Sequence, residues 1–136
     1  MKIIVQKFGG TSISSHERRN LVVNKIVKAK EDGYLPIVVV SAMGRYGEPY
    51  ATDTLLSLIS SSFKAQNPQA VDLLMSCGEI ISTIVLCEEL FSQGISAMPL
   101  TGGQAGIITD DKFNNAKVIK VLTNNVLRLI KSGIEI

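Results

Sequence analysis

The hydrophobic and polar positions of the first forty residues predict a strand, a helix and a second strand. Residues 3–6 begin with an apolar, β-branched run typical of a buried strand. A capping box at residues 14–17 opens a helix that should end at Gly33. Residues 37–40 are continuously apolar, as in a parallel strand buried on both faces. This order predicts one right-handed βαβ unit. The helix would bury a face made of Val22, Val23, Ile26 and Val27.

Downstream, the pattern predicts two helices, two short strands and a last helix. These elements cover residues 52–63, 67–92, 95–100, 117–121 and 123–132. Helices that alternate with strands predict an α/β domain with a mainly parallel sheet. Residues 133–136 read as a strand that is just beginning. That ending predicts either a piece of a longer domain or a small complete α/β domain with an edge strand at its C-terminus.

Composition narrows the classes of function. The chain has 136 residues, enough for one domain, and 46% hydrophobic against 19% charged residues excludes a disordered tail. Aromatic residues make up only 5% and Trp is absent, so the core must be aliphatic and base-stacking platforms for nucleic acid are lacking. The net charge of +2 comes from scattered basic residues, which also argues against a nucleic-acid partner.

Cysteine and histidine usage predicts neither disulfides nor a metal site. Cys77 and Cys87 lie in an apolar helical stretch and are expected to be reduced core residues of a cytoplasmic protein. One histidine and no paired cysteine motif make a zinc site improbable. The sequence also predicts no signal peptide and no apolar run of membrane-spanning length, hence no membrane partner.

The most informative segment is residues 7–12, which read KFGGTS. It follows the first strand and precedes the first helix. Gly9 and Gly10 would let backbone N–H groups approach an anion, and Lys7 would add a full positive charge. The segment matches neither the Walker spacing nor G-x-G-x-x-G, so a plain strand-to-helix turn remains the alternative.

Two further segments resemble this turn in composition. Residues 41–44 and 101–106 are also small, polar and glycine-bearing, and each follows a predicted strand. Ligands of parallel α/β sheets bind beyond the carboxyl ends of strands, so the three segments together predict a ligand site. Loops between strands and helices are commonly built from the same residue types, which is the alternative.

Glu79 places a carboxylate in a mostly apolar helix, directly after Gly78. Such a carboxylate needs a partner, and a ligand ammonium would serve. Glycine inside a helix costs stability and permits close approach, which favours a functional reading. The alternative is a solvated stripe at helical spacing, made of Asp72, Ser76, Glu79 and Thr83.

These segments together resemble the aspartokinases. The resemblance rests on residues 7–12, 39–44, 52–53, 76–79 and 101–106, in order along the whole chain, and residues 45–52 look like the single-function forms of Gram-positive bacteria. It implies the amino acid kinase fold, a three-layer α/β/α sandwich. It also implies transfer of the γ-phosphoryl group of ATP, with Mg²⁺, to the side-chain carboxylate of L-aspartate, giving 4-phospho-L-aspartate, the first step towards lysine, threonine, methionine and diaminopimelate.

The resemblance also implies roles for individual residues. The phosphates of ATP would be held by Lys7, Phe8, Gly9, Gly10 and Ser12, with Lys7 as the catalytic residue. The L-aspartate site would include Ser41, Thr52 and Glu79, the last facing the substrate ammonium. A carboxylate nucleophile is already ionised at neutral pH, so the reaction requires no general base. No protein metal ligand is assigned, and a homo-oligomer is expected.

The chain departs from the family by what it lacks. Its aspartokinase relatives have a longer catalytic domain with a later nucleotide-binding segment, followed by regulatory ACT domains. The chain therefore looks like the N-terminal portion of a catalytic domain, expected to be incomplete at its C-terminus and nearly inactive alone. Two other readings stay open: another amino acid kinase, or a non-catalytic association fragment whose bare sheet edge pairs with a second copy.

Overall fold

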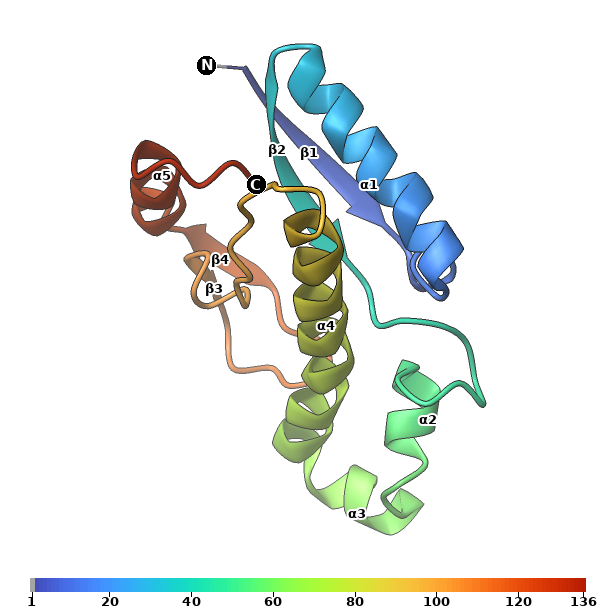
Figure 1. The fold of residues 1–136 in the computed structure, drawn as a ribbon. Helices are drawn as coiled ribbons and strands as arrows, with labels where there is room; N and C mark the ends of the chain where they lie inside the picture. Colours follow the sequence, from blue (N-terminus) through green and yellow to red (C-terminus); the bar gives the residue numbers. More distant parts are fainter. Residues whose placement is uncertain (1) are drawn as a thin grey trace.

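The computed structural model describes residues 2–136, and its first half contains the predicted βαβ unit. Strand β1 (Lys2–Phe8) leads into helix α1 (His16–Glu31), and strand β2 (Tyr34–Val40) lies parallel to β1. The register pairs Lys2 with Tyr34 and Phe8 with Val40. Both strands therefore end at the same edge, beside the start of α1 (Figure 1). The expected strand, helix and strand are confirmed.

The two faces of the β1–β2 sheet differ in how far they are covered by other elements. On one face Gln6 Nε2 donates to the Lys25 carbonyl of α1 at 3.4 Å, and Phe8 and Val38 pack against the core. On the other face Val5 is 64% and Val39 45% exposed. The prediction that β2 is buried on both faces is thus wrong for residues 2–136, because the elements described here cover only one face fully.

Helix α1 begins one residue later than the capping box implied. The N-cap is Ser15, whose Oγ accepts a hydrogen bond from the Arg18 N–H at 3.3 Å. Ser14 Oγ instead donates to the Thr11 carbonyl at 3.2 Å, so the predicted capping box is wrong. Its end is as predicted, since Gly33 has a φ of +81° directly after the C-cap residue.

The predicted helix over residues 52–63 is two short helices, α2 (Thr52–Leu56) and α3 (Ser61–Gln66). The break occurs at Ser60, whose Oγ accepts from the Phe63 N–H at 3.2 Å and starts a new helix. The long helix is confirmed as α4 (Pro68–Phe91), with its proline in the first turn.

Helices α1 and α4 meet in the core. The cluster is aliphatic, as expected, and is made of Ile13, Val22, Val23, Ile26, Met43, Leu86 and Leu90. Helix α4 runs between the βαβ unit and the C-terminal elements (Figure 1). Its Leu86 and Leu90 share the core cluster with Ile13 and Met43, which belong to the loops that follow β1 and β2.

Helix α4 is also long and apolar enough to cross a membrane by length and composition, with a mean hydropathy of 1.8 over its most apolar window. This differs from the prediction that no such run exists. Core helices of globular folds meet the same criterion, and α4 buries Val71, Leu86 and Leu90 against its neighbours. Its apolar character is therefore accounted for, in part, by packing within the fold.

The C-terminal elements are smaller than predicted. Strands β3 (Ile107–Thr109) and β4 (Val118–Val121) pair antiparallel, and helix α5 (Asn124–Lys131) follows. The strand predicted over residues 95–100 is absent from the described structure, as is the one beginning at Gly133. The two segments are joined instead by Met98 N–H to the Ile136 carbonyl at 3.1 Å and Glu135 N–H to the Ser96 carbonyl at 3.2 Å. These two bonds do not build a strand ladder, so neither segment is a strand.

Candidate functional site

The loops that leave β1 and β2 are joined by backbone hydrogen bonds. The Gly44 N–H donates to the Gly10 carbonyl at 3.1 Å, and the Ser41 N–H donates to the Phe8 carbonyl at 3.2 Å. The first of these loops forms a tight turn, η1 (Gly10–Ser12). Two of the three glycine-bearing segments predicted to meet are therefore in direct contact at the carboxyl ends of the strands.

Ala42 packs against two glycines, and a larger residue at either position would clash with it. A Cβ at Gly10 would collide with the Ala42 carbonyl oxygen, and a Cβ at Gly78 would lie 2.7 Å from the Ala42 Cβ. Gly9 is different: its φ is −77°, and no atom of the described residues lies within 4 Å of a Cβ built there. Packing requires glycine at residues 10 and 78, whereas nothing within residues 2–136 requires it at Gly9.

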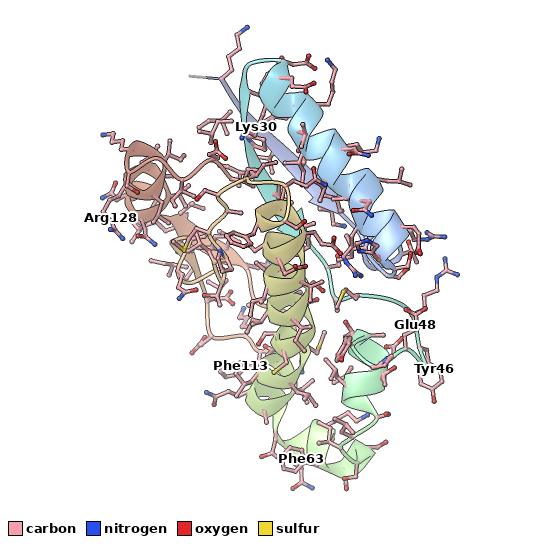
Figure 2. The ribbon with its side chains drawn as sticks, in the orientation of Figure 1. Lys30, Tyr46, Glu48, Phe63, Phe113 and Arg128 are labelled. Carbon is pink, nitrogen blue, oxygen red and sulfur yellow. The ribbon has the colours of Figure 1, made fainter. Side chains whose placement is uncertain are left out.

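A hollow of about 560 Å³ opens where these loops meet the start of α2. It brings together Gly10, which the resemblance assigns to the ATP phosphates, and Ser41 and Thr52, which it assigns to L-aspartate. The lining is completed by Thr11, Ala42, Gly44, Arg45, Tyr46, Ala51 and Asp53. Tyr46 points outward from the loop between β2 and α2, with Glu48 beside it (Figure 2). The hollow has the size of a small-molecule site.

Sequence reasoning missed Arg45 and Asp53, which line the hollow with opposite charges. Within the described residues the Arg45 side chain forms neither a hydrogen bond nor an ion pair, so its guanidinium is available to an anion. The available signal was its position, directly after the glycine that ends residues 41–44. Residues 45–52 contributed to the resemblance, but neither charged residue was assigned to a site.

Only one carboxylate oxygen of Glu79 has a hydrogen-bond partner within the described residues. Its Oε1 accepts from the Ala42 N–H at 3.4 Å, while its Oε2 is buried and has no hydrogen-bond partner among residues 2–136. The solvated-stripe alternative is not supported, because Asp72 on that stripe accepts from the Asn114 N–H at 2.9 Å and Glu79 is turned towards Ala42. A buried carboxylate oxygen without a donor is costly unless a ligand supplies one.

Glu79 lines a second, larger groove of about 730 Å³ between β2, α4, the third glycine segment and α5. Val39 lines the same groove, and Lys7 is its register partner on β1. Register partners in a parallel pair share a sheet face, so Lys7 lies on the groove side of the sheet. The site residues are thus divided between two spaces, which adjoin where Glu79 of the groove contacts Ala42 of the hollow.

The remaining predicted residues take other places. Phe8 packs against the core, and neither Gly9 nor Ser12 lines the hollow or the groove. The third glycine segment lines the groove through Thr101, Gly102, Gln104 and Ala105, although it does not follow a strand. Cys77 is exposed rather than buried as predicted, and burial raises the pKa of the half-buried Cys87 thiol.

With this geometry established, comparison with known proteins identifies the family. The sequence model of the amino acid kinase family matches residues 2–136. The chain belongs to the amino acid kinase family. Within it, the chain is 51% identical over 121 residues to Aspartokinase 1 of Bacillus subtilis, covering 89% of this chain and 30% of that protein. It is 38% identical over 133 residues to the aspartokinase of Geobacillus stearothermophilus, covering 98% of this chain and 31% of the relative.

Solved structures agree with this placement of the amino acid kinase chain. The aspartate kinase of Synechocystis superposes with a TM-score of 0.61 at 36% identity, over 77% of this chain and 17% of that one. Aspartokinase III of E. coli, solved with aspartate and ADP, superposes with a TM-score of 0.70 at 17% identity over 98% of this chain and 39% of that one, which supports the fold alone. The predicted resemblance and α/β fold class are confirmed. The chain spans about 30% of the length of the curated relatives that it matches.

Proposed function

We propose that this chain carries the phosphate-binding turn and the aspartate-recognising part of an aspartokinase, which transfers the γ-phosphoryl group of ATP to L-aspartate. The single observation that carries the proposal is Glu79, whose buried Oε2 has no partner among the described residues while Oε1 contacts the loop that lines the hollow. An ammonium is the ligand group that matches a buried, unpaired carboxylate oxygen. The sequence similarity to aspartokinases supports L-aspartate as the source of that ammonium.

The proposed chemistry is positioning and charge stabilisation. The attacking group is a carboxylate that is ionised at neutral pH, so no side chain has to remove a proton from it. Lys7 and the N–H groups of the glycine turn would hold the phosphates and offset their developing charge. Ser41 and Thr52, which line one hollow with Gly10, would orient the substrate next to that turn.

Gly9 supports a phosphate role independently of Glu79. Its ordinary φ and open surroundings leave no reason within residues 2–136 for glycine at this position. Close approach of a ligand to the backbone is the reason that remains. Gly9 precedes η1, so a ligand there would face the start of the turn.

Mg²⁺ would accompany ATP. This ion is typically held by substrate phosphates with one or two carboxylates, and the hollow offers one carboxylate, Asp53. No cluster of three metal-ligating side chains occurs in the described part of the chain. When bound, Mg²⁺ would stabilise charge on the transferred phosphoryl group.

The test of aspartate recognition compares L-aspartate with succinate, which has both carboxylates but no ammonium. Calorimetric titration of the chain should give an affinity for L-aspartate about tenfold or more higher than for succinate, because one charge-assisted hydrogen bond contributes a free energy of that size. Glu79→Gln should abolish the preference, whereas Glu88→Gln, at an exposed position of the same helix, should keep it. Equal affinity of the unaltered chain for both ligands would refute the proposed role of Glu79.

The test of phosphoryl transfer uses hydroxylamine to trap acyl phosphate formed from MgATP and L-aspartate. A signal that Lys7→Ala abolishes would establish that the chain assembles a working site. A chain that binds L-aspartate without producing acyl phosphate would instead carry recognition only, with the transfer step dependent on the remainder of a longer protein.

The proposal extends to association between copies. Ile3 and Val5 are exposed apolar residues on one face of β1, and such faces are commonly covered by another protein surface. This supports the expected homo-oligomer and also the alternative of a non-catalytic association fragment. Light scattering over a range of concentrations separates them from a monomer, and the ligand titrations above separate the enzyme from the fragment.

A further inference from the structure

A buried ion pair lies behind the glycine turn, outside the hollow and the groove. Glu89 of α4 is 6% exposed and accepts from Arg19 Nε of α1 at 2.8 Å. His16 Nδ1 lies 2.9 Å from the same carboxylate oxygen. Sequence reasoning assigned His16 no role and did not single out Glu89 or Arg19. The cluster joins the start of α1 to the last two turns of α4.

The arginine of this pair reaches the turn itself. Arg19 Nη1 donates to the Ile13 carbonyl at 3.3 Å and lies 4.0 Å from Met43 Sδ. Ile13 follows η1 directly and is fully buried, and its own N–H donates to the Gly10 carbonyl at 3.3 Å. One guanidinium therefore contacts residues of both loops that form the candidate site.

A neighbouring arginine holds the other end of the same turn. Arg18 Nη1 donates to the Thr11 carbonyl at 2.8 Å, which also accepts from Ser14 Oγ. The Ser12 and Ile13 N–H groups donate to the Gly9 and Gly10 carbonyls within the turn, so every carbonyl of Gly9, Gly10, Thr11 and Ile13 accepts a hydrogen bond. Arg18 is exposed, however, whereas Arg19 is 17% exposed and anchored by Glu89.

We propose that Glu89 is a positioning residue for the glycine turn: it fixes Arg19, which in turn fixes Ile13 and the loop at Met43. The role in phosphate binding rests on the proposed function, while the ordering of the turn does not. Arginine suits the task because its planar fork can bind Glu89 and the Ile13 carbonyl at once. Lysine at residue 19 would keep the charge but not the fixed geometry of two donors.

The test measures amide hydrogen exchange in the chain without ligand, so its result does not depend on whether the turn binds phosphate. The reporting amides are those of Ser12, Ile13 and Gly44, each of which donates within or to the turn. The reference amides are those of Leu122 and Leu127 in the C-terminal elements. Glu89→Gln should speed exchange of the reporting amides about tenfold or more and leave the reference amides within about twofold.

Two further variants sharpen the result. Glu88→Gln removes an exposed carboxylate next to Glu89 and should change neither set of amides. Arg19→Lys keeps the charge that faces Glu89 and should still speed the reporting amides, which provides the test if Glu89→Gln fails to fold. Reporting amides that keep the rate of the unaltered chain, or a uniform increase at all amides, would overturn the proposal.

A second experiment tests whether the ordered turn binds phosphate, separately from whether Glu89 orders it. MgATP is titrated into the unaltered chain and into Arg19→Lys. Binding that weakens about tenfold or more in Arg19→Lys supports the link between the ordered turn and phosphate. If the unaltered chain binds no MgATP, the phosphate role fails, and the exchange result still decides whether Glu89 orders the turn.

Discussion

Gly78 of α4 lies directly against Ala42, so that a Cβ added at residue 78 would be 2.7 Å from the Ala42 Cβ. This contact brings the helix that carries Glu79 as near as it can come to the loop leaving β2. The next residue, Glu79, consequently reaches the Ala42 N–H. The glycine that weakens the helix is therefore the one that brings the carboxylate to the site.

Gly78→Ala should destabilise the chain. Alanine would gain about 1 kcal/mol of helix propensity, but overpacking against Ala42 costs about 1–3 kcal/mol. We expect a net loss of about 1 kcal/mol in the free energy of unfolding, measured by urea denaturation. Gly102→Ala is the control, because no described atom lies within 4 Å of a Cβ at that residue. A variant at residue 78 as stable as the unaltered chain would contradict the packing argument.

Gly9→Ala and Gly10→Ala should separate binding from folding. At Gly10 the added methyl would collide with the Ala42 carbonyl, so stability should fall by about 1–3 kcal/mol. At Gly9 it would meet open space, so stability should be unchanged while affinity for MgATP falls about tenfold. Urea denaturation and calorimetric titration measure the two effects. Unchanged MgATP binding by a folded Gly9→Ala variant would argue against phosphate at this residue.

Arg45→Ala should weaken binding of the anionic substrate without affecting stability. The side chain lines the hollow and has no partner of its own in the described part of the chain. A charge-assisted hydrogen bond is worth about 1.5–3 kcal/mol, so affinity for L-aspartate should fall about tenfold or more. Arg128→Ala, on α5 away from the hollow (Figure 2), should have no effect. Equal affinity of both variants would mean that Arg45 does not contact the ligand.

Acid should destabilise the chain partly through Glu89. Burial raises the pKa of Glu89, but hydrogen bonds from His16 and Arg19 lower it more, leaving the pKa below its ordinary value of 4.5. A lowered carboxylate pKa stabilises the fold above the unfolded pKa, and this stabilisation is lost as pH falls through the folded pKa. The loss should therefore occur below about pH 4.5.

Thermal unfolding between pH 3 and 7 measures this effect. Glu89→Gln should be less stable at pH 7 by about 1–3 kcal/mol, since Arg19 loses its charged partner, and should show a shallower acid dependence. Glu17 and Glu135 also have lowered pKa values, so part of the dependence should persist. An acid profile identical to that of the unaltered chain would show that the ion pair contributes nothing.

The sequence predicted those elements whose signals are local. β1, α1 and β2 follow from apolar periodicity and from Gly33, and α4 follows from a long apolar run that starts at Pro68. The break before α3 was missed because Ser60 was counted as a residue inside one helix, whereas its side chain caps the start of a new one. The prediction of a strand over residues 95–100 was wrong. A strand needs a neighbouring strand to pair with, and the apolar pattern of one segment does not show whether such a neighbour is available.

The candidate site was predictable only in part, because some of its contacts depend on segments that are far apart in the sequence. Glycines after strand ends marked the two joined loops, and an isolated carboxylate marked Glu79. The division of the site between the hollow and the groove depends on how α4 approaches the sheet, which no short segment encodes. The pair of Glu89 and Arg19 links residues 70 positions apart, and neither stands out from neighbouring charged residues in the sequence.

That separation sets an order of events in folding. β1, the glycine turn, α1 and β2 lie within the first forty residues, and β1 pairs with β2 there. The guanidinium that holds Ile13, in contrast, is fixed only after α4 has docked with Glu89 in place. Contacts so distant along the chain require a large loop to close and form late. During synthesis, which proceeds from the N-terminus, the turn is among the first segments made and among the last to reach its final shape.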